Sequence, residues 1–241
     1  VRAKLNIDVE QIRQANPNII YVRGTGQGES GPDADKGSYD SLAFWARAGA
    51  AIGSTRPEYG SLTANPPGPG FGDSIGGMTI AGAIMGALFH RERTGEATEV
   101  DVSLFGTGLW AMGQAVAMSL VAGQAFAMPP ASQMNRNPLV YVYETKDGRF
   151  ISLTCLQAGK YWRPLCEAMG NEELMNDERF ESHFGLLEHG ADAVKILTDE
   201  FKQHTLDEWR KKLDSFTGQW AVLQDALEAA SDPRGIATGY M

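Results

Sequence analysis

Cysteine, histidine and long apolar runs are all scarce in this sequence of 241 residues. The two cysteines, Cys155 and Cys166, have neither a paired spacing nor a nearby histidine, which predicts reduced, buried thiols. The four histidines lack metal-ligand spacing, and no serine is framed as GxSxG. Neither metal catalysis nor a serine triad therefore has support, and we expect no bound metal.

The longest apolar stretch, around residues 78–89, is too short and too rich in glycine to predict a membrane span. The N-terminal residues are too polar for a signal peptide. A net charge of −9 argues against a surface for nucleic acid or anionic lipid. We therefore expect a soluble cytoplasmic protein with no nucleic-acid or membrane partner, and 43% hydrophobic residues suffice for a substantial core.

The first part of the chain has the pattern of an α/β unit. The β-branched and aromatic run at 18–23 is typical of a buried strand, and 99–105 alternates as a strand does. Asn16-Pro17 should stop the first helix, and Gly95 should end the third, whose last turn is basic. The expected helices cover 6–15, 41–52, 75–94 and 106–123, the last of them almost wholly buried.

The composition changes near residues 128–138 to proline, asparagine, glutamine and methionine, which predicts a domain boundary. We place one domain at residues 1–130 and a second at 131–241. In the second, two alternating runs flank Lys146-Asp147-Gly148, a strong hairpin signal. Helices are expected over 159–169, 190–204 and 205–216, and the last opens with Thr205 and Glu208 at capping-box spacing. This pattern predicts a small α+β domain.

The loop after the first strand contains Gly26, Gly28 and Gly31 in GxGxxG spacing. A dinucleotide site would need a helix to begin there, and the segment PDADKG after Gly31 does not supply one. A nicotinamide or flavin site is therefore disfavoured. A glycine-rich loop at the carboxyl end of a strand can still line an active site.

Asp73 is the most informative residue by position, because it lies between a glycine-proline loop and a long apolar helix. It could simply be the N-cap of that helix, its carboxylate accepting amide hydrogen bonds. It could also be a nucleophile, since amide donors and the helix dipole keep a carboxylate ionised and oriented. The residues alone leave both roles open.

Four stretches of the sequence resemble the class III CoA-transferases, a family that shares its fold with α-methylacyl-CoA racemase. They are NPNIIYVRGTGQGESGP, KGSYDSLAFWARAG, GDSIGGMTIAGAIMGALFHRERTGEATEVDVSLF, and the hairpin YETKDGRFISL with its helix KYWRPLCEAMG and the later DERF. The resemblance implies an α/β, Rossmann-like large domain, incomplete in this chain, a small α+β domain, and an interlocked homodimer. We expect these residues to contribute only part of such a protein, because the family's first strand-helix units and its returning C-terminal segment have no counterpart here.

The resemblance implies that Asp73 is the nucleophile that moves coenzyme A between carboxylic acids. It would attack an acyl-CoA thioester to give an aspartyl-acyl anhydride, and then form an aspartyl-CoA thioester. Lys4, Lys36, Tyr39 and Asp40 match positions near the coenzyme, and Gly26, Gln27 and Gly28 match the substrate loop. Coenzyme A would take part as a substrate thioester.

Three alternatives remain open from the sequence. A racemase would need an acid-base pair, and Tyr39 stands where racemases of this fold have histidine, which favours the transferase. A second possibility is a CoA-binding or scaffold subunit without catalysis, and a third is a portion that is inert alone. The glycine-rich lid of formyl-CoA transferase has no counterpart in PPASQMNRNPLVY, which disfavours oxalate and formyl-CoA as substrates. The sequence does not identify the donor acid, the acceptor acid or the pathway.

Overall fold

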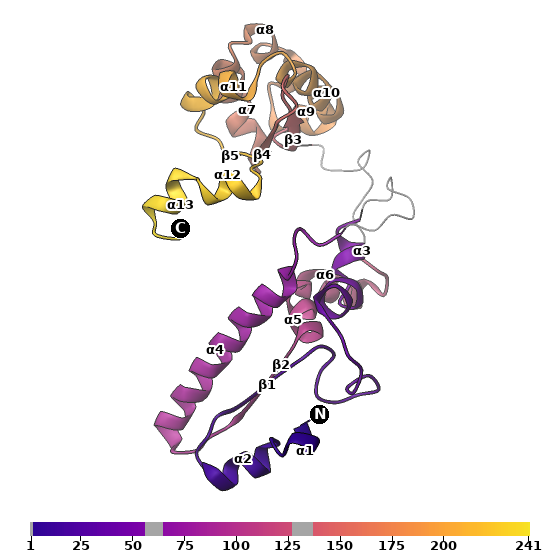
Figure 1. The fold of residues 1–241 in the computed structure, drawn as a ribbon. Helices are drawn as coiled ribbons and strands as arrows, with labels where there is room; N and C mark the ends of the chain where they lie inside the picture. Colours follow the sequence, from indigo (N-terminus) through magenta and orange to yellow (C-terminus); the bar gives the residue numbers. More distant parts are fainter. Residues whose placement is uncertain (1, 56–64, 127–136) are drawn as a thin grey trace. The chain divides into compact units, whose positions relative to one another are not determined.

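A computed structural model of the chain describes residues 2–55, 65–126 and 137–241 (Figure 1). The chain divides into two compact units, residues 1–132 and 133–241, each with its own internal packing. The predicted boundary between residues 130 and 131 lies outside the described residues, as do residues 56–64 of the glycine-proline loop before Asp73.

The first unit is built on two parallel strands, β1 (Tyr21–Thr25) and β2 (Glu99–Ser103), paired from Tyr21↔Glu99 to Thr25↔Ser103. Parallel strands need a crossover connection, which here includes helix α4 (Phe71–Thr94). Figure 1 shows α4 running beside the two strands. The unit's other helices are α1 (Arg2–Leu5), α2 (Val9–Ala15), the π-helix η1 (Ser41–Arg47), α3 (Ala50–Gly53), α5 (Leu104–Ala111) and α6 (Gly113–Ala122).

The two faces of the β1–β2 pair differ in chemistry. Gly24 and Val102 face α4, where the Cδ1 of Ile80 lies against Gly24. Because side chains alternate along a strand, Arg23 and Asp101 belong to the other face and pair with each other there. The run at 18–23 was predicted to be a buried strand, but β1 is only partly buried because this second face is charged.

Two predicted helices are each broken in the structure. The helix expected over 41–52 is interrupted at Gly49, whose φ of 91° lies in the left-handed region. The helix expected over 106–123 is two helices, α5 and α6, bent by 71° around Met112. The prediction that it is almost wholly buried was wrong, because no residue of α6 is buried within the described chain.

Helix α4 is longer than the apolar run that marks it in the sequence. It has 24 residues and is apolar enough to satisfy a length-and-composition test for a membrane span, which the bent pair α5–α6 also satisfies. The expectation that residues 78–89 are too short therefore underestimated the helix, which continues at both ends. Core helices that are mostly buried pass the same test, whereas 17% of the apolar window of α4 is buried within the described residues.

The second unit contains a three-stranded antiparallel sheet with strand order β3-β4-β5. The predicted hairpin is confirmed, with β3 (Val140–Glu144) and β4 (Phe150–Thr154) joined by a turn in which Gly148 has a φ of 72°. The third strand, β5 (Trp220–Val222), was not predicted, because three residues carry too little pattern. The helices of the second unit are α7 (Ala158–Met169), α8 (Glu172–Met175), η4 (Glu178–Phe180), α9 (His183–Glu188), α10 (Gly190–Phe201), α11 (Leu206–Lys212), η5 (Leu213–Ser215), α12 (Ala226–Ala230) and α13 (Pro233–Ala237).

The core of the second unit is aromatic and aliphatic. Phe201 stacks on both Tyr143 and Trp209, with ring centroids 4.7 and 4.4 Å apart. Cys155 and Cys166 are fully buried in this core, as predicted, and burial raises the pKa of Cys166 to about 12. Both therefore act as small apolar residues rather than as reactive thiols.

Candidate functional site

A cleft of about 370 Å³ opens at the carboxyl ends of β1 and β2, beside the first two turns of α4. Ligands of open α/β sheets bind at these strand ends, because the loops that leave the strands converge there. The cleft is lined by Gly24, Thr25, Gly26, Ser38, Asp73, Gly76, Gly77, Ile80, Val102 and Leu104.

Asp73 is the third residue of α4, and the N-cap position is occupied by Gly70, with a φ of 68°. The side chain of Asp73 is exposed and faces the cleft, and no hydrogen bond or ion pair to it occurs within the described residues. The carboxylate thus lies in the positive field of a helix N-terminus without being used as its cap.

The first turn of α4 is capped from outside by Asp40. Its Oδ1 accepts a hydrogen bond from the amide of Gly72 at 3.0 Å, and the side chain is buried. A Cβ at Gly72 would overlap both Asp40 and Phe44, so only glycine allows this close approach. Asp40, matched in the sequence to a coenzyme-binding position, therefore lies beneath the helix, where it holds the backbone next to Asp73.

The glycine loop, residues 24–31, is held by side-chain hydrogen bonds. The side-chain amide of Gln27 donates to Ser38 Oγ at 3.0 Å and accepts from Arg47 at 2.8 Å. The backbone amide of Gly28 donates to Thr25 Oγ1 at 3.2 Å. A Cβ on Gly26 would lie 2.5 Å from that of Ser38, so glycine is needed there. Of the three predicted substrate-loop residues, Gly26 lines the cleft, whereas Gln27 and Gly28 shape the loop behind it.

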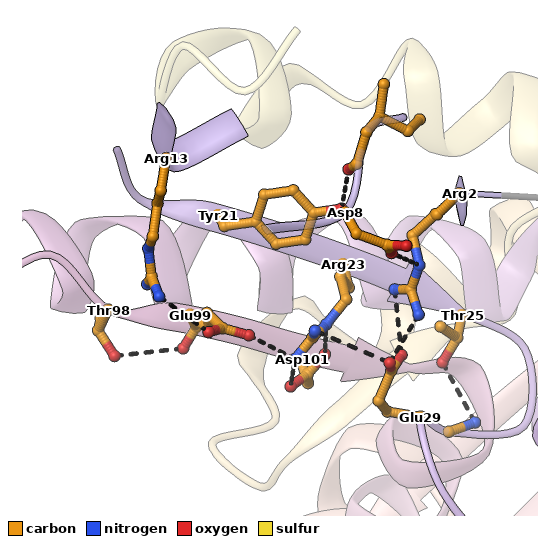
Figure 2. Close-up of polar contacts among 12 residues, drawn as sticks. Arg2, Asp8, Arg13, Tyr21, Arg23, Thr25, Glu29, Thr98, Glu99 and Asp101 are labelled. Carbon is orange, nitrogen blue, oxygen red and sulfur yellow. Dashed lines mark hydrogen bonds and ion pairs between the residues drawn. The ribbon is translucent and has the colours of Figure 1, made fainter. Parts of the chain in front are cut away.

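An ion-pair network on the outer face of β1 and β2 anchors the far end of the same loop (Figure 2). Arg23 pairs with Asp101 at 2.7 Å and with Glu99 at 3.0 Å, and lies 3.7 Å from Glu29. Arg2 of α1 reaches Glu29 at 2.6 Å. Glu29 belongs to the glycine loop, so the network joins the loop to both strands and to α1.

The guanidinium groups hold two of these carboxylates, Glu29 and Asp101, ionised. A hydrogen bond from Arg2 lowers the pKa of Glu29, and one from Arg23 lowers the pKa of Asp101, in both cases against a smaller effect of burial. No local pattern in the sequence marks this network, because its members come from four separate segments of the chain.

The predicted coenzyme contacts Lys4, Lys36 and Tyr39 are exposed and do not line the cleft. Lys36 pairs with Asp33 at 2.6 Å, and Arg47 pairs with the same carboxylate at 2.6 Å. Hydrogen bonds from these two cations lower the pKa of Asp33. Both cations thus lie at the outer end of the glycine loop.

Several cleft residues were not predicted as site residues. Gly76, Gly77 and Ile80 lie three, four and seven positions after Asp73, the spacing of one helix face, and this signal could have found them. Ser38 and Leu104 come from other segments, and no local pattern marks them. Within the described residues, no group of three or more histidine, cysteine, aspartate or glutamate side chains could hold a metal ion.

Comparison with characterised proteins places this geometry in a family. The sequence is 30% identical over 238 residues to (R)-2-hydroxy-4-methylpentanoate CoA-transferase from Clostridioides difficile, covering 99% of this chain and 58% of that protein. It is 28% identical over 239 residues to cinnamoyl-CoA:phenyllactate CoA-transferase from Clostridium sporogenes, covering 99% and 57%. The chain thus spans somewhat less than three fifths of the length of these relatives.

Solved structures agree on the fold. A CAIB/BAIF family protein from Brucella suis superposes with a TM-score of 0.81 at 24% identity, covering 99% of this chain and 61% of that one. Rv3272 from Mycobacterium tuberculosis superposes with a TM-score of 0.76 at 25% identity, with the same coverages. The sequence model described as CoA-transferase family III matches residues 1–241, and the chain therefore belongs to the CoA-transferase family III.

Proposed function

We propose that the protein transfers coenzyme A from an acyl-CoA to a free carboxylic acid, with Asp73 as the nucleophile. The observation that carries this proposal is an exposed carboxylate without a structural partner in the described chain, at the start of α4 and facing a cleft. The activities named for two relatives of this family, both CoA-transferases, support it.

The proposed reaction begins when the Asp73 carboxylate attacks the thioester carbonyl. The carbon–sulfur bond breaks, coenzyme A leaves as a thiolate, and an aspartyl-acyl anhydride remains. The thiolate then attacks the aspartyl carbonyl, which releases the first acid as a carboxylate and leaves an aspartyl-CoA thioester. The acceptor carboxylate attacks the aspartyl carbonyl of this thioester, which expels the coenzyme A thiolate and forms a second aspartyl-acyl anhydride. The thiolate then attacks the acyl carbonyl of the acceptor, which gives the new acyl-CoA and frees the Asp73 carboxylate.

This route divides the exchange into steps between similarly activated acyl groups, so each step has a modest free-energy change. The positive field of the α4 N-terminus favours the negative charge that develops on the acyl oxygen as the Asp73 carboxylate attacks. Lys4 and Lys36 would supply cations for the phosphates of coenzyme A, with Tyr39 beside it.

The proposal extends to the whole protein. Residues 1–130 would form part of a Rossmann-like large domain, as the parallel β1–α4–β2 connection suggests, and residues 131–241 most of a small α+β domain and its return linker. An interlocked cytoplasmic homodimer would cover the exposed apolar residues of the first unit, which include Met78, Phe89, Trp110, Leu120 and Val121. Sedimentation equilibrium of the intact protein tests the dimer.

The nucleophile is tested by intact-mass analysis and hydroxylamine trapping after incubation with a panel of acyl-CoAs. The unchanged protein should form an acyl adduct that hydroxylamine removes, and Asp73→Ala should form none. Asp207→Ala is the matched control, because Asp207 is an exposed aspartate on α11 of the second unit. Undiminished transfer by a folded Asp73→Ala variant would end the proposal.

Deuterium exchange and coenzyme A binding separate the other functions. A racemase would exchange the α-proton of a 2-methylacyl-CoA for solvent deuterium without an acceptor acid, but no histidine lines the cleft in the described chain. A scaffold subunit would bind coenzyme A saturably and form no adduct.

A further inference from the structure

The walls of the cleft carry information about the acyl group that enters it. Beyond Asp73, the described lining consists of glycines, two hydroxyl side chains and apolar side chains, so Asp73 is its one charged group in the part of the chain that the structure describes. Three cations near the glycine loop pair with carboxylates: Lys36 and Arg47, the last residue of η1, pair with Asp33, and Arg23 of β1 pairs with Asp101, Glu99 and Glu29.

Four of the residues that line the cleft form a row along α4. Asp73, Gly76, Gly77 and Ile80 lie along one face of α4, and seven residues of helix extend about 10 Å. Ile80 is the lining residue of α4 farthest from the helix start, with its Cδ1 3.6 Å from the position of a Cβ on Gly24, and Val102 also lines the cleft. Gly76 leaves just enough room for Leu104, whose Cδ2 would be 3.4 Å from an added Cβ. Gly77 has nothing within 4 Å, so the space beside it is open.

We infer that the acyl chain lies along this face of α4, over Gly77 and toward Ile80, and that the enzyme selects short monocarboxylic acids over dicarboxylic acids. The inference rests on the proposed function and adds the substrate class to it. A second carboxylate at the far end of the chain would meet apolar side chains and the charge of Asp73, and none of the lining residues in the described ranges is a cation that would compensate it.

The first test compares two acyl groups of equal chain length in the intact protein. Acyl-enzyme should form from butyryl-CoA about 10-fold or more faster than from succinyl-CoA, because the two differ in a terminal carboxylate. Equal or faster acylation by succinyl-CoA would overturn the inference while leaving Asp73 as the nucleophile. Absence of an adduct with every acyl-CoA would overturn the proposed function and this inference together.

The second test fills the open space. Gly77→Leu should slow acylation by butyryl-CoA roughly 10-fold and acylation by acetyl-CoA much less, because the added side chain occupies the path of the longer chain. Gly82→Leu is the matched control, since Gly82 is another exposed glycine of α4 with nothing within 4 Å and does not line the cleft. Equal effects of Gly77→Leu on the two substrates, or equal effects at both glycines, would contradict the placement of the acyl chain.

A third variant enlarges the far end. Ile80→Ala should accelerate acylation by octanoyl-CoA relative to butyryl-CoA, since an apolar side chain that lines the cleft is shortened. An unchanged ratio of the two rates would show that the chain does not reach Ile80.

Discussion

At the scale of single residues, two aspartates have different roles at the start of α4. Asp40 is buried and caps the helix through Gly72, and Asp73 is left exposed. Had Asp73 been the cap, its oxygens would have been engaged with backbone amides and less available to an acyl carbon. The separation of these roles explains how a carboxylate at a helix terminus can stay chemically free.

Replacing Asp40 tests this division. Asp40→Ala should lower the free energy of unfolding by about 1–3 kcal/mol, because the buried amide of Gly72 loses its acceptor. It should also lower the rate of acyl-enzyme formation, with the KM for acyl-CoA little changed, because the backbone that carries Asp73 loses its anchor. Urea unfolding and single-turnover trapping measure the two effects.

The conservative control is Asp40→Asn, whose side-chain oxygen can still accept from Gly72. It should restore most of the acylation rate. A variant Asp40→Ala that is destabilised but acylates at the normal rate would reduce Asp40 to a purely structural residue.

Gly72 offers a second residue-scale prediction. Gly72→Ala should lower the free energy of unfolding by more than about 1 kcal/mol, which is the usual cost of overpacking a filled site. The new Cβ would overlap Asp40 and Phe44. Gly82→Ala, at a glycine with open surroundings, should instead stabilise α4 by about 1 kcal/mol through helix propensity. Thermal unfolding of the two variants should therefore shift in opposite directions, and shifts of the same sign would contradict the packing described here.

At the scale of elements, local signals in the sequence predicted what depends on neighbouring residues. The hairpin at Gly148 and the capping box of Thr205 and Glu208 are both confirmed, because each needs only a few adjacent side chains. Gly95 was predicted to end α4 and does so with a φ of 78°. The bend at Met112 was not predicted, because the apolar pattern continues through it.

The C-terminal glycine of α4 can be tested in the same way. Gly95→Ala should lower the free energy of unfolding by about 1 kcal/mol, because a side chain is disfavoured in the left-handed conformation that ends the helix. Chemical denaturation measures it, and Gly86→Ala, inside the same helix with nothing within 4 Å, is the control that should not destabilise. If both variants behave alike, the backbone conformation at Gly95 does not limit the choice of residue.

The site was only partly predictable at this scale. The sequence placed Asp73 at a helix start and the glycine loop at a strand end, since both positions follow from local pattern. It did not reveal the Asp40 cap, which joins residues 32 positions apart, or the Arg23 network, which joins strands 78 positions apart. Such partners depend on the tertiary fold, which a linear pattern does not encode.

At the scale of the whole molecule, the carboxylates paired with arginine make stability depend on pH. Glu29 and Asp101 have ordinary pKa values of 4.5 and 3.8, and ion pairing lowers both in the folded state. The unfolded chain then binds more protons than the folded chain as the solution is acidified. Their contribution is therefore complete above the ordinary values and is lost as the pH falls through the lower folded-state values.

Acid titration should accordingly weaken the protein below about pH 4.5. Asp101→Asn should lose less stability over this range than the unchanged protein, because one of the titrating carboxylates is gone, although it should start from a lower stability at pH 7. Urea unfolding at a series of pH values provides the measurement. Parallel curves for the two proteins would mean that other groups control the acid transition.

The parallel pairing of β1 with β2 has a consequence for the order in which the protein folds. Residues at the two strand ends come together only after a loop of nearly 80 positions closes, and such long-range closure is slow compared with hairpin or helix formation. Catalytic competence should consequently appear late in refolding, after the ellipticity of the helices has recovered, so that trapping of the acylated enzyme would report complete assembly rather than mere collapse.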